Sequence, residues 1–314
     1  MKGAAVNHSY GSAPSGIMEA PHVVLPDAKV FSKRATRLRE LVMQVPALDE
    51  FLAFMARLVQ AQHQVLTEHE PAWRPAPDAF DQALKHGMPP LGFQALRRDV
   101  RWHTDLLAIL DAVELHVGER QRPLLDTLRE MSAERLDELA DEVFEMCPGR
   151  EATRPLLPLV AAALQVAWAR LAIDLPSAPA RPIGDAKALC PCCGAVPVAS
   201  VVHNERHRSG VRYLHCSLCA TEWHLERVTC SMCDTGGKLV YLTLDDDQGK
   251  PFLPVQAEAC NECNSYLKVM QRELHGRADP VADDLASLAL DMLLAEQDQY
   301  ARSGYNPLLI LGDD

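Results

Sequence analysis

The sequence lacks any apolar run that approaches the ~20 residues needed to span a bilayer, and its start lacks a basic segment followed by an apolar core. These absences predict a cytoplasmic chain with no membrane insertion. Positive charge is also scarce, because 31 Lys and Arg face 43 Asp and Glu, for a formal net charge of −12. An acidic surface repels polyphosphate, so we expect no nucleic-acid partner.

Recognisable catalytic motifs are missing as well. The chain has no Gly-rich phosphate loop, no His-Glu-x-x-His motif and no Gly-x-Ser-x-Gly nucleophile turn. We therefore predict that the protein is not an enzyme. Its 314 residues, 48% hydrophobic and 24% charged, still have the composition of a folded chain with two or three domains.

The first half of the chain is predicted to be an all-α helical domain. Residues 1–20 are rich in Gly, Ser and Ala, and we expect a disordered tail there. The helical domain should then span residues 21–178. A Pro-rich stretch at 179–188 is typical of a linker and marks the domain boundary.

Within this domain, apolar periodicity predicts the individual helices. Residues 48–66 place apolar side chains along one face of a buried amphipathic helix. Further helices are expected at 93–116 and at 133–147. The run 155–173 is the most apolar of all, and we expect it at the centre of the bundle.

After the linker the pattern changes to that of strands separated by turns. The predicted strands are 198–202, 211–215, 222–228, 239–244, 252–257 and 265–271. A unit of cysteine pair, hairpin, cysteine pair and strand occurs twice, which predicts two tandem four-cysteine modules at 189–229 and 230–275. A final helix at 281–300, within a C-terminal region of 276–314, should pack back on the body. The predicted class is therefore α+β.

Ten cysteines are present, and eight of them form Cys-x-x-Cys pairs. In a reducing cytosol this pattern indicates metal or redox chemistry rather than disulfides. Two intervening residues let both thiolates reach one ion, and two such turns facing each other across a hairpin complete a tetrahedron. The predicted ligands are Cys190, Cys193, Cys216 and Cys219 in the first site and Cys230, Cys233, Cys260 and Cys263 in the second.

The residue after each pair supports this prediction, because such turns often need a left-handed backbone. Gly, Asn and Asp tolerate that conformation best. The four positions hold Gly194, Ala220, Asp234 and Asn264, so three of the four fit.

The remaining cysteines and the histidines are expected to have other roles. We predict that Cys192 is a spectator, with a role as substitute ligand left open, and that Cys147 is a small buried residue whose replacement by serine costs little. The first module also has four histidines that the site does not need as ligands, and we expect them to support the ligands or to lie at the surface. They are His203, His207, His215 and His224.

The spacing of the cysteines does not determine which metal binds. A redox dithiol normally opens a helix in a βαβ unit, whereas these turns lie between strands, so we do not expect dithiol chemistry. Structural zinc and rubredoxin-like iron both accept four thiolates. The turn Cys190-Pro-Cys192-Cys193-Gly194 is suggestive of iron but does not decide the question.

Several segments resemble the formate dehydrogenase accessory protein family of the FdhE type. They are RYLHCSLCATEWHLERVTCSMC (212–233), VQAEACNECNSYLKVM (255–270), PVADDLASLALDMLLAEQDQYARSGYNPLL (280–309) and, more loosely, FLAFMARLVQAQ (51–62). The resemblance implies a helical domain, two rubredoxin-like modules, iron rather than zinc, and a cytoplasmic location. It also implies a role in maturing respiratory formate dehydrogenases by binding the molybdenum-containing catalytic subunit before export. The family's ligand pattern falls on the eight paired cysteines, and the third cysteine of the first turn is a departure from it.

We therefore expect a non-enzymatic assembly factor, with two alternatives kept open. An electron carrier is the first, because a ferric tetrathiolate takes up one electron with little rearrangement. A nucleic-acid-binding zinc ribbon is the second. It is disfavoured because residues 185–273 carry nine Lys and Arg against eleven Asp and Glu.

Overall fold

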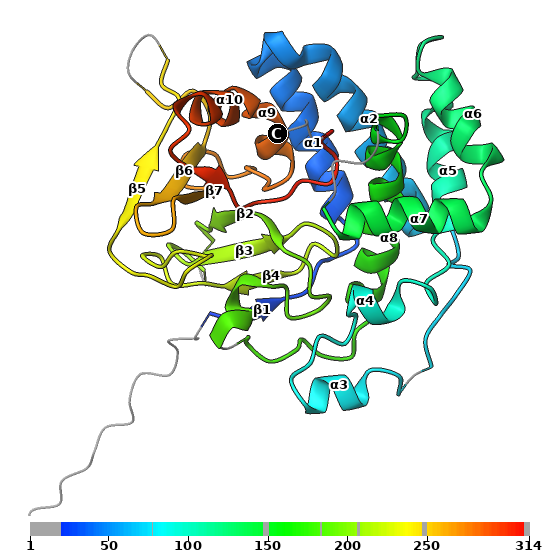
Figure 1. The fold of residues 1–314 in the computed structure, drawn as a ribbon, viewed down its shortest axis with the longest axis horizontal. Coiled ribbons are helices and arrows are strands. Elements are labelled where there is room, and N and C mark those ends of the chain that lie inside the picture. Colours follow the sequence, from blue (N-terminus) through cyan, green and yellow to red (C-terminus); the bar gives the residue numbers. More distant parts are fainter. Residues whose placement is uncertain are drawn as a thin grey trace, which may run out of the picture.

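The protein combines a helical bundle with a mixed β-sheet, which lie side by side in Figure 1. The computed structural model describes residues 20–76, 78–146, 151–182, 184–205, 208–246 and 250–310. In the described residues, eight of the ten α-helices lie between the first strand and the second, and the other two lie between the seventh strand and the eighth. The predicted α+β class is therefore confirmed.

Ten α-helices and three short 3-10 helices are found in the described residues. The α-helices are α1 (Val30–Gln44), α2 (Asp49–Glu68), α3 (Asp81–Lys85), α4 (Phe93–Leu96), α5 (His103–Glu114), α6 (Arg122–Glu130), α7 (Ala133–Phe144), α8 (Leu157–Ile173), α9 (Ala282–Ala286) and α10 (Leu288–Gln297). The 3-10 helices are η1 (Pro46–Leu48), η2 (Arg154–Leu156) and η3 (Gly184–Ala188).

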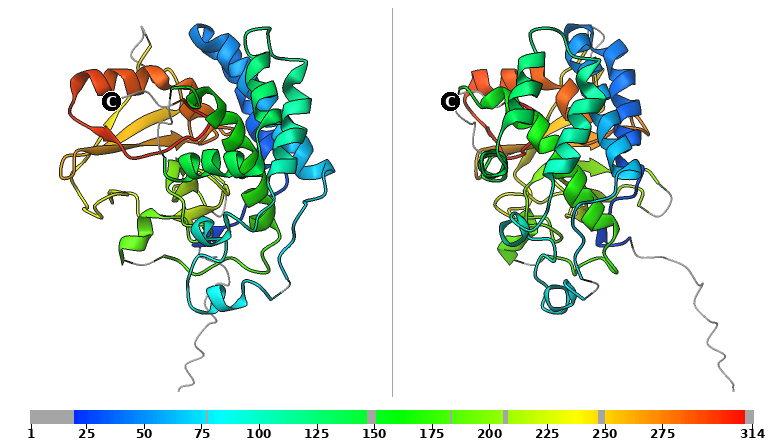
Figure 2. Two further views of the ribbon diagram at one scale, coloured as in Figure 1. Left: turned by 45° about the vertical axis from the view of Figure 1, so that its right-hand side comes forward. Right: turned by 90° about the vertical axis from the view of Figure 1, so that its right-hand side faces the viewer.

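Helix α8 forms the centre of the bundle, as its sequence predicts. It packs against α2, α5 and α7, and its green ribbon lies among the other helices in Figure 2. The stretch Arg154–Ile173 is long and apolar enough to cross a membrane by length and composition, but 89% of its most apolar window is buried inside the protein. Its hydrophobicity therefore stabilises the interior of the bundle.

The predicted helix at 93–116 is wrong in its middle. Helix α4 ends at Leu96 and α5 begins at His103, although no Gly or Pro interrupts the stretch. The turn between them lets Val100 and Trp102 become buried, and Trp102 is fully enclosed. Packing of a large aromatic side chain thus outweighs the local helical preference.

Among the described residues, eight strands form a single sheet. The strands are β1 (Val23–Val24), β2 (Pro197–Val202), β3 (Arg212–Cys216), β4 (Glu222–His224), β5 (Leu239–Leu242), β6 (Val255–Cys260), β7 (Ser265–Gln271) and β8 (Ala301–Arg302). Their order is β1-β4-β3-β2-β7-β6-β5, with β8 paired to β7. Strand β4 is shorter than the predicted strand at 222–228.

A parallel pair between β2 and β7 joins the two cysteine modules into one sheet. Ser200 lies opposite Val269, and Val202 lies opposite Gln271. The sequence pattern predicts the modules one after the other and contains no sign of this pairing, because the two strands are far apart in the chain. The modules therefore share a continuous backbone ladder instead of only a connecting segment.

The two ends of the described chain also add to the sheet. Strand β1, within the region predicted as helical, pairs with β4 through Val23 and Trp223. The predicted C-terminal helix at 281–300 is divided at Ser287 into α9 and α10. Helix α9 packs on α1, as expected of a helix that returns to the body.

Candidate metal centres

Four sulfur atoms of the first module converge on one point. The Sγ atoms of Cys190 and Cys219 are 3.6 Å apart. Those of Cys193 and Cys216 are 3.4 Å apart, and all four lie within 4.8 Å of one another. A tetrahedral ion with metal–sulfur bonds of about 2.3 Å requires sulfurs about 3.8 Å apart. The thiols therefore match a single tetrahedral ion after a small outward shift.

The second module repeats this arrangement with spacings still closer to the ideal. Cys230 and Cys263 have their Sγ atoms 3.7 Å apart. Cys233 and Cys260 have theirs 3.8 Å apart, and this group also lies within 4.8 Å. The structure thus brings the eight predicted residues together in the two predicted groups of four.

The turns have the backbone geometry that the sequence predicts. The residue after each cysteine pair has a positive φ, at 79° for Gly194, 60° for Ala220, 58° for Asp234 and 53° for Asn264. Ala220 adopts this conformation although a Cβ disfavours it. The positive φ lets the chain fold back while the backbone N–H groups of the turn stay close to the sulfurs.

Those N–H groups donate hydrogen bonds to the thiol sulfurs. Leu218 and Cys219 donate to Cys216 Sγ at 3.4 Å, and Met232 donates to Cys230 Sγ at the same distance. Such donors stabilise negative charge on sulfur. These bonds therefore lower the cost of the negative charge that Cys216 and Cys230 would carry with a metal bound.

The helical bundle holds the first site in place. The N–H groups of Leu91 and Phe93 donate to the carbonyls of Cys192 and Cys193 at 2.7 and 3.1 Å. Gln165, on the central helix α8, donates to the carbonyl of Ser217 at 2.8 Å. All four cysteines of this site are buried, so bundle and site form one packed unit.

The second site lies much closer to solvent. Cys230 and Cys260 are buried, but Cys233 and Cys263 are exposed. Met232, within the first turn of the site, is 56% exposed. On the other turn, the Tyr300 hydroxyl donates to Asn261 Oδ1 at 2.6 Å. The second site is therefore held by fewer neighbouring groups than the first.

The electrostatics of the first site favour a cation at its centre. Burial raises the pKa of the Cys190, Cys193 and Cys216 thiols well above the ordinary value. Burial acts on Cys219 as well, but hydrogen bonds from the surrounding thiols outweigh it and hold its pKa well below that value. The site without an ion thus favours a single thiolate, and only a bound cation can offset four negative charges there.

In the second site the pKa values of the two N-terminal cysteines are also shifted in opposite directions. Burial raises the pKa of Cys230 to about 12. A hydrogen bond with the Thr235 side chain lowers the pKa of Cys233 to about 6. The donor set of both sites, with four soft sulfurs and no oxygen or nitrogen, fits zinc or iron equally well.

The other candidate residues that the structure describes do not join either group. Cys192 is buried beside the first site and is absent from its set of four. Cys147 and His207 lie outside the described residues, so their predicted roles stay predictions. His203 and His215 are buried in a polar network rather than at the surface, and no periodic pattern in the sequence could show this.

We expect fully loaded protein to hold two ions per chain and to release them to a chelator in two phases. The second site should lose its ion at least about tenfold faster, a difference of roughly 1.4 kcal/mol in activation free energy, because two of its cysteines are exposed. A metallochromic indicator would follow the release.

The Cys233→Ser variant assigns the phases, because it should lack the fast phase and keep the slow one. Protein unfolded in denaturant is the reference for total metal. A single release phase from folded protein would contradict the expected difference, and fewer than one ion per chain after reconstitution would contradict the sites themselves.

Comparison with known proteins gives consistent matches along the chain. The family described as "FdhE, N-terminal" matches residues 20–185, "FdhE, central domain" matches 189–227, and "FdhE, C-terminal domain" matches 228–309. Together they include the helical bundle and both cysteine groups.

Individual relatives cover nearly the same extent. "Protein FdhE" of Shigella boydii serotype 18 is 37% identical over 294 residues, which are 93% of this chain and 92% of the relative. "Protein FdhE" of Escherichia coli O1:K1 is 36% identical over the same length. The crystal structure of the FdhE protein from Pseudomonas aeruginosa matches with a TM-score of 0.82 and 34% identity, covering 93% of this chain and 100% of that one.

Proposed function

Because the chain belongs to the FdhE family, we propose that it is a non-enzymatic, cytoplasmic accessory protein for formate dehydrogenases. In this proposal the protein takes part in enzyme maturation and recognises the molybdenum-containing catalytic subunit before export. The eight paired cysteines hold two metal ions, and the ions are iron. Family membership supports the accessory role, and the identity of the subunit is the further step that the proposal takes.

One observation carries the non-enzymatic role. Each candidate metal site offers four cysteine sulfurs to one ion, so a tetrahedral ion has no position left for substrate or water. Closed sites of this kind are structural, whereas catalytic zinc sites keep a position open. The ions would therefore act by holding the shape of the sheet.

Shape is what recognition of a partner requires. Strands β2 and β7 join the modules directly, and the first site is bonded to the helical bundle through Leu91, Phe93 and Gln165. Loss of either ion should therefore alter a surface shared by the modules and the bundle. This coupling links metal loading to partner binding in the proposal.

Co-purification with the catalytic subunit of a formate dehydrogenase tests the proposal. The wild-type chain should capture the subunit, and the Cys230→Ser/Cys233→Ser double variant should lose most of this capture. Cys192→Ser is the matched control, because it removes a buried thiol that is not among the eight grouped cysteines. It should capture the subunit as well as wild type does.

Two results would count against the proposal in different ways. A double variant that stays folded and captures the subunit normally would show that the second site is not needed for recognition. A wild-type chain that captures nothing would remove the accessory role and favour an electron carrier.

The electron carrier is the second candidate function, and the exposure of Cys233 and Cys263 favours it. Exposed ligands bring an ion near enough to the surface to exchange an electron with a partner. If the sites hold ferric iron, protein purified in air should be red from thiolate-to-iron charge transfer. A reversible one-electron couple would support the carrier, and colourless, zinc-only protein from iron-rich, zinc-poor medium would exclude it.

A further inference from the structure

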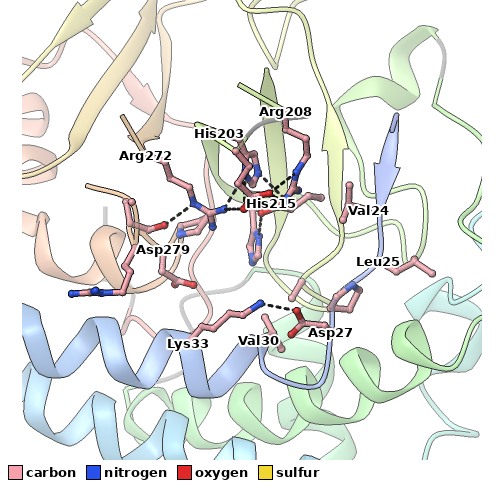
Figure 3. A pocket seen from close by; sticks show the side chains of 18 of the residues that line it. Val24, Leu25, Asp27, Val30, Lys33, His203, Arg208, His215, Arg272 and Asp279 are labelled. Atoms are coloured by element: carbon pink, nitrogen blue, oxygen red, sulfur yellow. Dashed lines mark hydrogen bonds and ion pairs between the residues drawn. The ribbon is translucent and has the colours of Figure 1, made fainter. Parts of the chain in front are cut away.

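A cavity of about 460 Å³ lies where helix α1, the segment before it, strands β3 and β4 and the loop before α9 meet. Its volume is within the range of small-molecule sites. Figure 3 shows His215 between Arg208 and Lys33, with Arg272 and Asp279 to its left and Val24 and Leu25 to its right. None of the grouped cysteines lines it.

One hydrogen bond of the His215 ring determines which of its two nitrogens carries the hydrogen. Arg34 Nη2 is 3.2 Å from His215 Nε2. A guanidinium group can only donate, so Nε2 must accept and the hydrogen of the neutral ring must be on Nδ1. His215 is 4% exposed, which makes this N–H group a buried donor.

That donor has no hydrogen-bond partner among the described residues. His215 Nδ1 is among the buried nitrogen atoms without one. Glu222 Oε1 lies 3.5 Å away, beyond the length of an ordinary hydrogen bond. Buried polar groups without a partner are rare in folded proteins, so each one needs an explanation such as a bound ligand or water.

The carboxylates around the cavity are already engaged by other donors. Glu222 Oε2 accepts from His203 Nε2 at 2.9 Å and from Arg208 Nη1 at 3.2 Å. Asp279 Oδ1 accepts from Arg34 Nε at 3.0 Å and from the N–H groups of Val281 and Ala282.

Donors, by contrast, remain available. Arg272 uses Nε on the carbonyl of Ala278 and Nη1 on His203 Nδ1. Its Nη2 has no partner among the residues that the structure describes. Lys33, at the rim, donates only to Asp27 there. The polar wall of the cavity therefore holds N–H groups without a hydrogen-bond partner among the described residues. Two of the donor groups are cations, and one of these, Arg272, also lies 3.6 Å from Glu205 Oε1 through its Nη1.

The opposite wall is apolar. It is formed by Val24, Leu25, Pro26 and Val30, and Ala278 and Pro280 add further apolar groups to the lining. A ligand that satisfies both walls needs a group that accepts hydrogen bonds at one end and a hydrocarbon body at the other.

We propose that this cavity binds a small organic carboxylate with an apolar body. The carboxylate accepts from His215 Nδ1 and Arg272, with Lys33 at the entrance, and the body lies against the wall formed by Val24 and Val30. Charge-assisted bonds from a guanidinium favour a carboxylate over a neutral group of the same shape. The proposal does not depend on the role in formate dehydrogenase maturation.

Isothermal titration of the metal-loaded full chain tests the ligand class. The probes are 3-phenylpropanoate, hexanoate and acetate, together with the neutral 3-phenylpropanamide. The two larger carboxylates should bind with one site per chain and a Kd below about 1 mM, and acetate should bind more weakly because it lacks the apolar body. The amide should bind at least about tenfold more weakly than its acid, because the charge-assisted bonds are lost.

Three substitutions locate the site. Arg272→Met should weaken binding of 3-phenylpropanoate about tenfold or more. Lys33→Met should weaken it roughly two- to fivefold, since this side chain is exposed at the rim. Arg39→Met is the matched control on the same helix, because it removes the same charge outside the cavity lining and should change nothing.

The proposal has clear contrary outcomes. Equal binding of acid and amide to the wild-type chain would overturn the carboxylate assignment. The absence of saturable binding by either large carboxylate would overturn the site. If Arg272→Met fails to fold, Lys33→Met still decides the location, because an unchanged affinity there, equal to that of Arg39→Met, would place the ligand elsewhere.

Discussion

Replacing Cys216 with serine is expected to remove the metal from the first site and to unfold the sheet around it. Cys216 ends β3 in the middle of the sheet order, and its sulfur accepts two backbone N–H groups. The binding free energy of a structural tetrathiolate ion, about 10–16 kcal/mol in small zinc peptides, is also folding free energy. Its loss is comparable with the roughly 5–15 kcal/mol that stabilises an ordinary domain.

Metal analysis and thermal unfolding would measure both effects of Cys216→Ser. The Cys192→Ser variant is the control, because Cys192 is equally buried and close by but is not one of the four grouped cysteines. It should keep both ions and lose only about 1–2 kcal/mol. Equal metal loss in the two variants would mean that Cys192 is a ligand and that the first site has been assigned wrongly.

Cys260→Ser should have a more local effect than Cys216→Ser. It removes a ligand from the second site, where two cysteines are exposed and the bundle makes no backbone bonds to the turns among the described residues. Metal content should fall to one ion per chain, while the helices keep their circular dichroism signal. Collapse of the whole chain would show that the second site supports the bundle through the β2–β7 pair.

The sequence was sufficient to predict the candidate metal ligands, because short-range geometry determines them. Two residues between cysteines bring both sulfurs to one side of a turn, and the next residue needs a left-handed backbone. Gly194, Asp234 and Asn264 meet that need, and the structure gives all three a positive φ. Helix α8 was equally predictable, since a long apolar run has few alternatives to a central position.

The parts that the sequence could not predict depend on contacts between distant segments. The β2–β7 pair joins residues about seventy positions apart, and no local pattern specifies a parallel partner. The break between α4 and α5 follows from burial of Trp102. The cavity around His215 requires Arg34 from α1 and Asp279 from the C-terminal region, which only the folded chain brings together.

The attachment of the C-terminal helices is another feature that the sequence could not predict. The apolar pattern at 281–300 predicts a helix held by hydrophobic contacts, yet Met292 is 65% exposed and only part of that pattern is buried. Buried charges provide much of the attachment instead. Lys268 on β7 donates to the Ser287 hydroxyl at 2.9 Å and to Asp291 at 2.6 Å.

Asp284, on α9, lies at the centre of this charged cluster and is fully buried. Arg302 Nη2 donates to both of its carboxylate oxygens, at 2.7 and 2.8 Å, and Asn306 donates at 2.8 Å. The Lys268 ammonium lies 3.2 Å from Oδ1. A single carboxylate therefore links β7, α9 and β8.

The Asp284→Asn variant is expected to lose about 3–5 kcal/mol of stability, because it leaves buried cations without their counter-charge. For a chain of this size the melting temperature should fall by roughly 5–15 °C. Urea unfolding followed by circular dichroism would measure the loss. Asp298→Asn is the matched control, since Asp298 is exposed and its φ of 49° suits asparagine, and it should cost less than about 0.5 kcal/mol.

The same variant should alter the pH dependence of stability. Burial alone would raise the pKa of Asp284, but Lys268 and Arg302 outweigh it and hold the pKa below the ordinary value of 3.8. The carboxylate therefore contributes stability that is complete above that value and is lost as the pH falls through its folded-state pKa. The difference between wild type and Asp284→Asn should accordingly shrink on acidification and stay constant near neutral pH.

A double-mutant cycle with Lys268→Met separates attraction between the charges from the cost of burying them. If the pair interacts as the distances indicate, the double variant should be more stable than the sum of the two single losses predicts, by about 0.5–3 kcal/mol. The reason is that removing both charges leaves neither one buried and uncompensated. Strict additivity would show that Asp291 alone neutralises Lys268, and that Arg302 is the effective partner of Asp284.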